Sequence, residues 1–289
     1  MKTLGLTMVI SLFVLKSSLA QFENTDVGAR ATALNGAFTS LSNNSLAVFY
    51  NPSGLGQLKF REGSFFYNPS VLGVSEISTA AFTFAEPMKF GTLGLGVKTF
   101  GFDLYRETSF VLSYGNNFRN KIFYGLNLNL YNLKIQNYNS ANSFGVDFGA
   151  MAYITGFLKW GFFAKNLSGA KIGESKQRIN QVYKTGFTVQ TGNDFSLILE
   201  FEKDVRYPLS FKSGLEYNVI DFIDFRTGIG TQPASFSAGV GINYDIFQID
   251  YALLKYNELG ITNQGSVTIN FGGNTARKLM REQLQDAFK

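Results

Sequence analysis

From about residue 62 to residue 271 the chain alternates apolar and polar side chains with a period of two. In one such run Phe236, Val240 and Tyr244 share one parity, while Gly, Ser and Asn occupy the other. This is the pattern of a β-strand whose two faces meet different surroundings. Clusters of Gly, Asn, Asp and Pro interrupt the alternation about every ten to sixteen residues, as turns do. Counting the runs between these clusters predicts about fourteen strands.

One run departs from this rule. Beyond Asn132 the phase slips, because Leu133 and Ile135 fall on the parity that is polar earlier in the same run. A β-bulge, or a strand that leaves the bilayer at this point, would explain the change.

The composition indicates what surrounds the apolar face. Aromatic residues make up 16% of the chain, with 30 Phe and 14 Tyr, and charged residues also only 16%, against about 25% in average soluble chains. A soluble sandwich or propeller also alternates, but a soluble exterior would spread Lys and Glu where this chain has aromatic residues. The sequence therefore predicts an all-β fold, a transmembrane antiparallel β-barrel of about fourteen strands over residues 62–272, with lipid around it.

Residues 1–20 have the form of a cleavable signal peptide. Lys2 precedes an apolar run from Leu4 to Leu15, and small residues stand at Ser18 and Ala20, so Gln21 is the expected mature start. The apolar run is too short to span a bilayer as a helix. We therefore expect a bacterial outer-membrane protein with both termini in the periplasm, since an even number of strands returns the barrel to the side on which it began.

Several kinds of chemistry are missing from the composition. The chain has no Cys and no His, which removes imidazole bases and triads and makes a zinc site improbable. Its formal net charge of +5 is too mild to indicate nucleic-acid binding. We expect no enzymatic activity, no metal and no cofactor.

Residues 21–61 are expected to plug the barrel. A barrel of about fourteen strands encloses more space than inward side chains can fill, since about eight strands is the self-filling size. The segment is rich in Gly and Ala, which pack closely in a confined space. Pro52 favours an extended Asn51, whose side chain can form an Asx turn. Arg30 is the one cation between residues 21 and 55, so a carboxylate in the lumen is its expected partner.

Three stretches of this segment, residues 26–31 (DVGARA), 36–39 (GAFT) and 47–55 (AVFYNPSGL), together resemble the N-terminus of the PorV/PorQ family. That family belongs to the wider group of barrels similar to the fatty-acid transporter FadL. The resemblance implies a hatch inside a fourteen-stranded barrel, with the Asn-Pro-Ser-Gly-Leu element at the end of the hatch. The resulting hatch and gating candidates are Asp26, Gly28, Arg30, Asn51, Pro52, Gly54 and Leu55.

Charged residues of three predicted strands fall on the inner face. With a turn near Arg206, Glu200 lies opposite Lys212, and a turn near Asp221 brings Glu216 close to Asp224 or Arg226. We expect one patch on the inner wall, which is either a ladder that braces the wall and the hatch or a polar site for substrate or ions. The predicted lumen charge network is Glu200, Glu202, Lys212, Glu216, Asp224 and Arg226.

Residues 273–289 carry a helical pattern beyond the last strand. Asn274 or Thr275 is the expected N-cap, and Leu279, Met280, Leu284 and Phe288 recur at helical spacing, so these four are partner-helix candidates. The helix is expected in the periplasm, where it lies on the inner leaflet, tucks under the barrel or docks onto a partner.

Two functions remain open at this point. The resemblance implies a docking or shuttle component of the type IX secretion pathway of Bacteroidota-like bacteria, with secretion subunits or cargo C-terminal domains as partners. The alternative is a FadL-like passive channel for hydrophobic small molecules. A purely structural or adhesive membrane protein is a third hypothesis. Inward positions that are mostly Gly, Ser, Thr, Asn or charged favour the first hypothesis over the second.

Overall fold

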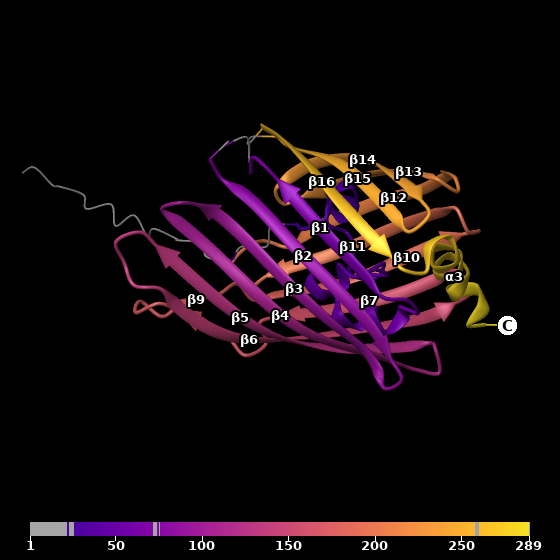
Figure 1. Ribbon diagram of the computed structural model, residues 1–289, viewed down its shortest axis with the longest axis horizontal. Coiled ribbons are helices and arrows are strands. Elements are labelled where there is room, and N and C mark those ends of the chain that lie inside the picture. Colours follow the sequence, from indigo (N-terminus) through magenta and orange to yellow (C-terminus); the bar gives the residue numbers. More distant parts are fainter. Residues whose placement is uncertain (1–21, 23–25, 72–73, 75, 258–259, 289) are drawn as a thin grey trace, which may run out of the picture.

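The computed structural model describes residues 22, 26–71, 74, 76–257 and 260–288, over which the chain forms a closed antiparallel β-barrel (Figure 1). Fourteen strands of the described chain make the wall, and β16 pairs with β1 to close it. The wall strands are β1 (Glu62–Asn68), β2 (Ser78–Met88), β3 (Gly91–Phe102), β4 (Tyr105–Phe118), β5 (Ile122–Ile135), β6 (Ala141–Thr155), β7 (Leu158–Lys165), β10 (Val182–Thr191), β11 (Phe195–Asp204), β12 (Ser210–Ile220), β13 (Ile223–Thr231), β14 (Ala234–Tyr244), β15 (Phe247–Tyr256) and β16 (Gly260–Asn270). The predicted fold class is confirmed.

The outward face of the wall is apolar. On β5, Leu126 and Leu128 are at least half exposed on the outside, whereas Asn127 and Asn129 are buried in the lumen. Exposed aromatic residues recur around the barrel at Phe65, Phe82, Phe110, Phe144, Phe187, Phe201, Phe225, Phe236 and Tyr251. An apolar exterior combined with a polar interior is the arrangement of a barrel that spans a membrane.

Strand β5 shows that the change of parity after Asn132 is not a bulge. Its pairing with β4 and β6 keeps one register from end to end. Leu133 points inward and is buried with Tyr131 and Ile172 in an apolar cluster. The inner face therefore becomes apolar here without any shift of the strand, and the bulge prediction is wrong.

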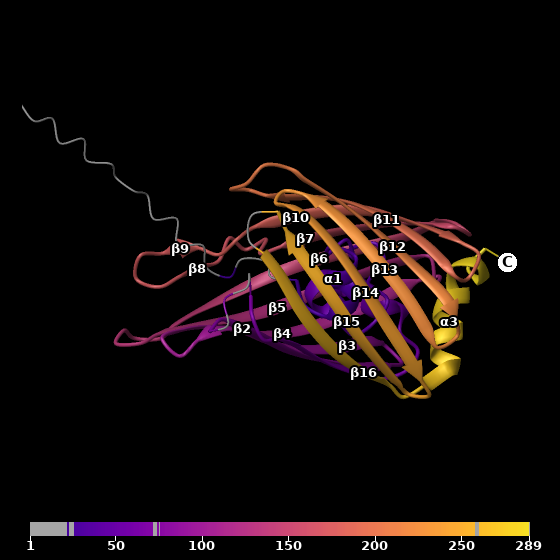
Figure 2. The ribbon, with the colours of Figure 1, turned by 90° about the horizontal axis from the view of Figure 1, so that it is seen from above.

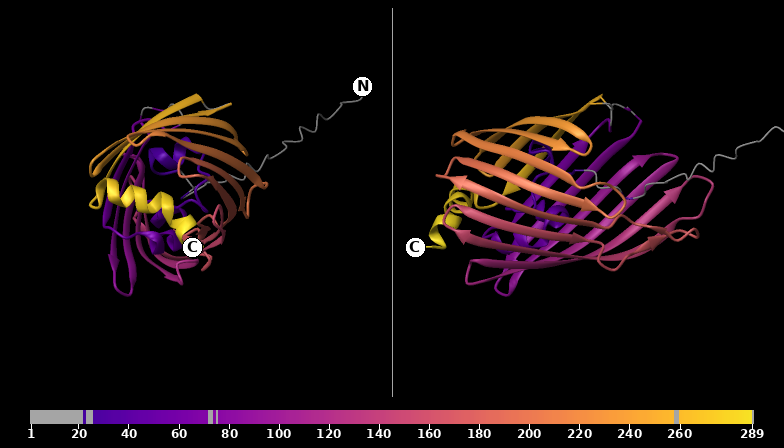
Figure 3. Two further views of the ribbon diagram at one scale, coloured as in Figure 1. Left: turned by 90° about the vertical axis from the view of Figure 1, so that its right-hand side faces the viewer. Right: turned by 180° about the vertical axis from the view of Figure 1, so that it is seen from behind.

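The two ends of the barrel differ. At one end, the hairpin end, β8 (Lys171–Ile172) and β9 (Gln177–Arg178) form a small hairpin between β7 and β10. At the other, the helix end, α3 (Gly273–Asp286) lies across the opening (Figure 3, left). No helix among the described residues has the length and apolar character needed to cross a bilayer.

Helix α3 begins earlier than expected. Its N-cap is Gly272, with no side-chain cap, so neither Asn274 nor Thr275 caps the helix. The Asn274 side-chain oxygen instead accepts a hydrogen bond from Arg277, one turn along. Gly272 allows a tight turn beside Phe60, because a Cβ on Gly272 would lie 2.4 Å from the Phe60 ring.

The segment before β1 lies inside the barrel (Figure 2). It contains α1 (Ala29–Ala33), α2 (Ala47–Tyr50) and the 3-10 helix η1 (Pro52–Gln57). We call residues 26–58 the hatch. Its apolar side chains pack on the inner wall, and Ile198, which interrupts the polar face of β11, is fully buried in this contact.

Glycines on the inner face let the hatch approach the wall closely. A Cβ at Gly125 would lie 2.4 Å from the Pro52 carbonyl carbon, and one at Gly149 would lie 2.1 Å from the Asn51 side-chain oxygen. Such distances essentially never occur for real Cβ atoms. We define the glycine belt as the inner-face glycines at which an added Cβ would lie this close to atoms of the hatch. Its members are Gly94, Gly96, Gly115, Gly125, Gly149, Gly161, Gly214, Gly228, Gly230 and Gly239.

The start of β1 and the end of β16 both lie at the helix end, as an even number of strands requires. Phe22, in contrast, is buried at the hairpin end against Tyr131. Which end faces the periplasm stays a prediction. The expected signal peptide and its cleavage site lie outside the described residues.

Candidate functional site: the hatch and its wall contacts

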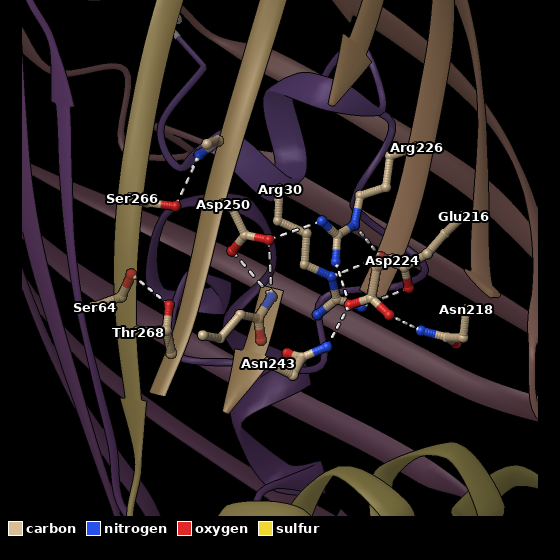
Figure 4. Close-up of polar contacts among 12 residues, drawn as sticks. Arg30, Ser64, Glu216, Asn218, Asp224, Arg226, Asn243, Asp250, Ser266 and Thr268 are labelled. Atoms are coloured by element: carbon tan, nitrogen blue, oxygen red, sulfur yellow. Dashed lines mark hydrogen bonds and ion pairs between the residues drawn. The ribbon is translucent and has the colours of Figure 1, made fainter. Parts of the chain in front are cut away.

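Arg30 on α1 ties the hatch to the wall (Figure 4). Its Nε and Nη2 donate to the two carboxylate oxygens of Glu216 on β12, both at 2.8 Å, and its Nη1 donates to Asn43 Oδ1 at 2.8 Å. The Arg30 and Glu216 side chains are only 12% and 8% exposed. A two-point arginine–carboxylate bridge fixes orientation as well as distance. The lumen carboxylate expected as the partner of Arg30 is therefore Glu216.

Arg226 on β13 is the centre of the charge cluster that Arg30 joins. Its three guanidinium nitrogens donate to Glu216 Oε2 at 2.6 Å, Asp250 Oδ1 at 2.7 Å and Asp224 Oδ2 at 2.9 Å. Glu216 thus lies between Arg30 of the hatch and Arg226 of the wall (Figure 4). Because these charges bind one another, the arrangement favours a brace between hatch and wall over a vacant ion site.

A second charge group lies on β10 to β12. Lys184 and Lys212 both contact Glu202 Oε2, at 2.8 and 2.9 Å. Glu200 Oε2 accepts hydrogen bonds from the backbone N–H groups of residues 38–39 in the hatch, at 3.1 and 2.9 Å. Glu200 pairs with Lys212 in register as predicted, but its nearest cation is Lys184 at 3.7 Å. The predicted single patch consists of two groups, and each holds a different part of the hatch.

The Asn-Pro-Ser-Gly-Leu element links the hatch to itself and to β6. Asn51 is extended, with φ of −167°, and its Oδ1 accepts from the Ser53 N–H at 3.2 Å and the Ser53 hydroxyl at 2.7 Å. Its Nδ2 donates to the carbonyl oxygens of Thr39 at 2.8 Å and Ala150 at 3.3 Å. The predicted Asx turn and the extended residue before Pro52 are confirmed.

The remaining hatch candidates occupy tight packing positions. Gly28 has φ of +89°, and a Cβ there would lie 2.4 Å from a leucine side chain of the hatch. A Cβ at Gly54 would lie 1.9 Å from a backbone carbonyl oxygen. Leu55 is fully buried. The carboxylate of Asp26 lies against Gly36, and its buried Oδ1 has no hydrogen-bond partner within the described chain.

A polar chamber of about 90 Å³ lies between the hatch and α3. Charged and carboxamide side chains line it, among them Arg30, Glu62, Asp224 and Asn243, and Arg281 of α3 forms part of its boundary. Leu41, Ala276 and Met280 also line it, but an apolar molecule in the chamber would remove water from the charged side chains without offering them a new partner, which costs free energy.

An aromatic cavity of about 30 Å³ lies on the other side of the hatch, against β3 to β7. Most of its lining is apolar or aromatic: Val27, Val48, Phe49, Tyr50, Val111, Tyr131 and Phe163. Two lysines, Lys98 and Lys165, and one carboxylate, Asp147, also line it. Neither ammonium group forms an ion pair with any carboxylate that the structure describes.

The four partner-helix candidates, three on α3 and Phe288 just beyond it, differ in burial. Leu284 is fully buried against Phe123, Met151 and Tyr153 at the barrel mouth, and Met280 packs on a hatch cluster. Leu279 and Phe288 are 42% and 41% exposed. Of the three positions considered for the helix, the structure shows it under the barrel.

Sequence reasoning missed several contributors. Lys184 belongs to the second charge group, and Asp250 belongs to the cluster around Arg226. Both residues fall on the inward-facing parity of their strands, and this parity could have identified them. The glycine belt was read only as part of the polar inner face. No group of His, Cys, Asp or Glu within the described chain is suited to hold a metal ion.

Comparisons with known proteins identify the fold. No protein-family model and no curated protein matches the chain. The solved structure of the CymD monoaromatic hydrocarbon channel matches with a TM-score of 0.65 and 12% identity, over 86% of this chain and 99% of that one. A FadL homologue from Pseudomonas aeruginosa matches with a TM-score of 0.64 and 11% identity, over 86% and 99%. The toluene transporter TodX of Pseudomonas putida matches with a TM-score of 0.61 and 10% identity, over 86% and 98%.

At these identities the likeness shows a shared fold. The chain is thus a β-barrel of FadL-like architecture whose lumen holds a hatch. No finding supports the narrower PorV/PorQ assignment, which stays a prediction.

Proposed function

We propose that the protein is a passive, non-enzymatic outer-membrane channel through which small apolar molecules pass a movable hatch. The observation that carries this proposal is the aromatic cavity between hatch and wall. Tyr131 belongs both to this cavity and to the apolar cluster with Leu133 at the hairpin end, so apolar surface extends from that mouth to the hatch. Channels for monoaromatic hydrocarbons among the structures of similar fold add support.

The hatch must move for anything to pass. A cavity that holds benzene measures about 150 Å³, whereas the aromatic cavity measures about 30 Å³. On this proposal the structure represents the closed state. A shift of α2, whose residues 48–50 line the cavity, would enlarge it.

Lys98 and Lys165 suggest which apolar molecules are preferred. The one carboxylate in the lining, Asp147, already accepts hydrogen bonds from Asn127 and Asn129. The two lysines therefore favour a ligand that has an apolar body and an acidic end. We therefore expect benzoate to be taken up faster than uncharged toluene of similar size. Replacing both lysines with Gln should remove this preference and leave toluene uptake unchanged.

A disulfide across the hatch boundary tests the proposal. The hydroxyl oxygens of Ser40 in the hatch and Thr188 on β10 are 2.8 Å apart, and the chain has no native Cys. We expect the Ser40→Cys/Thr188→Cys variant to take up radiolabelled toluene at host background when oxidised, in a Gram-negative host that lacks its major porins. Reduction with dithiothreitol should restore uptake, and either single-Cys variant is the control. Equal uptake in the oxidised and reduced forms would overturn the proposal.

Docking in type IX secretion is the second candidate. The specific observation in its favour is the filled lumen, in which the polar chamber and the aromatic cavity are both small. The exposed side chains of Leu279 and Phe288 would meet a secretion subunit or a cargo C-terminal domain. A pull-down from solubilised outer membranes that recovers such proteins, and loses them in the Leu279→Asp/Phe288→Asp variant, would favour docking over transport.

A further inference from the structure

We propose that α3 is a releasable lid, a second closure in series with the hatch that separates the polar chamber from bulk solvent at the helix end. The proposal does not depend on which of the two functions is correct, because it concerns access to the chamber alone. Figure 3 (left) shows the helix lying across the opening.

The contacts of α3 with the barrel rim span its opening. Gln285 Nε2 donates to Asn193 Oδ1 in the β10–β11 turn at 3.1 Å, and Arg277 Nη2 donates to the Asp245 carbonyl in the β14–β15 turn at 2.6 Å. Lys121 in the β4–β5 turn lies 4.3 Å from the centre of the Phe288 ring. Together, α3 and Phe288, which follows it, touch three separate turns of the rim, so the helix crosses the mouth.

The lid also touches what lies beneath it. Gln190 Nε2 on β10 donates to the Arg281 carbonyl at 2.7 Å, and Gln283 Nε2 donates to the Gln57 carbonyl of the hatch at 3.3 Å. Arg281 Nη2 lies 3.8 Å from Asp224, which belongs to the charge cluster that holds Arg30. The lid and the hatch are therefore in contact through Gln57 and share one charge cluster.

The balance of these contacts indicates a lid that can detach. Leu284 and Ala276 are the buried apolar side chains of α3, and Met280 packs partly buried on the hatch. The hydrogen bonds of the helix to the rim and to the groups beneath it are single polar contacts. The wall strands, in contrast, have complete ladders on both sides. Elements with few buried apolar contacts open at lower free energy than the core. We therefore expect α3 to leave the mouth while the barrel stays folded.

Thiol labelling tests the lid, because the absence of native Cys makes any introduced thiol unique. Asn243 lines the polar chamber and is 4% exposed, whereas a Cβ at Gly156 in the β6–β7 turn would meet nothing within 4 Å. We expect a charged, water-soluble maleimide to label Asn243→Cys at least tenfold more slowly than Gly156→Cys in the otherwise unchanged protein. Removing residues 273–289 should bring the two rates together.

Point variants keep the test decisive if the truncated chain folds poorly. In the Asn243→Cys background, Leu284→Asp should raise the labelling rate at least tenfold, since it places a charge in the buried contact. Leu279→Asp, on the exposed face of the same helix, should leave the rate low. Slow labelling of Asn243→Cys in both Leu284→Asp and the truncated chain would overturn the proposal, as would fast labelling in the unchanged helix.

Discussion

Glu216 should contribute more to stability than Arg30, although the two form one ion pair. Arg30→Gln removes two charge-assisted hydrogen bonds, but Glu216 keeps its 2.6 Å bond to Arg226. With hydrogen bonds to charged groups at about 1.5–3 kcal/mol, we expect a loss of about 2 kcal/mol. Glu216→Gln instead leaves two arginines short of their partner, one of them 1% exposed. Breaking a buried pair in this way costs about 3–5 kcal/mol.

The measurement is the free energy of unfolding in urea, with the barrel in lipid vesicles. Trp160, the single tryptophan, lies on β7, away from the altered strands, and its fluorescence reports unfolding of the wall. Glu86→Gln is the matched control, because its pair with Arg61 is partly exposed, and such pairs contribute about 0–1 kcal/mol. An Arg30→Gln variant that loses as much stability as Glu216→Gln would refute the view that Arg226 supports the shared carboxylate.

Two further predictions concern the inner and outer faces of the wall. Gly149→Val should displace the hatch, because a Cβ at this position would lie 2.1 Å from a hatch oxygen. Trypsin should then cleave the variant after Arg30. Gly265→Val is the control and should stay resistant to trypsin, because a Cβ there would meet no atom nearer than 3.8 Å. Cleavage in neither variant would count against the glycine belt. Leu128→Arg, on a lipid-facing side chain that is 60% exposed, should destabilise the barrel by about 2–4 kcal/mol and reduce the folded band on unheated SDS gels. Tyr138→Arg, in an exposed turn, is the control, and equal folded fractions would argue against lipid contact at residue 128.

The wall was predictable from the sequence because each strand carries its own information. Alternation depends on neighbours two residues apart, and lipid on one side with a packed lumen on the other keeps the two sets chemically distinct. The same local rule placed Glu216 near Asp224 or Arg226 once a turn was assumed between the strands, and Arg226 is its partner in the register. It failed at Leu133, where the inner face is apolar because Ile172 of the β8–β9 hairpin covers it.

The contacts of the hatch could not be predicted from the sequence, because a local pattern does not show which distant residues meet. Arg30 and Glu216 are separated by 186 positions, and nothing in either strand or helix indicates which lumen carboxylate lies within range. The sequence could only require that a buried arginine have some partner. The glycine belt was visible as isolated inward glycines, but its meaning depends on which residues of the hatch lie opposite them, as Pro52 lies opposite Gly125.

The seam of the barrel, where β1 pairs with β16, explains why the hatch, the wall and α3 contact one another although they are three separate segments of the sequence. The hatch leads directly into β1 and α3 follows β16, so pairing β1 with β16 brings both closures to the same place. Glu62 stands at this seam: its Oε2 accepts from Asn270 Nδ2 at 2.7 Å, and its Oε1 accepts from the Ser45 backbone N–H of the hatch at 2.7 Å. Gln283 of the lid reaches Gln57 of the hatch beside it. Because the pairing of β1 with β16 places the end of the hatch beside α3, we expect the contact between Gln57 and Gln283 to form only in a barrel that has closed.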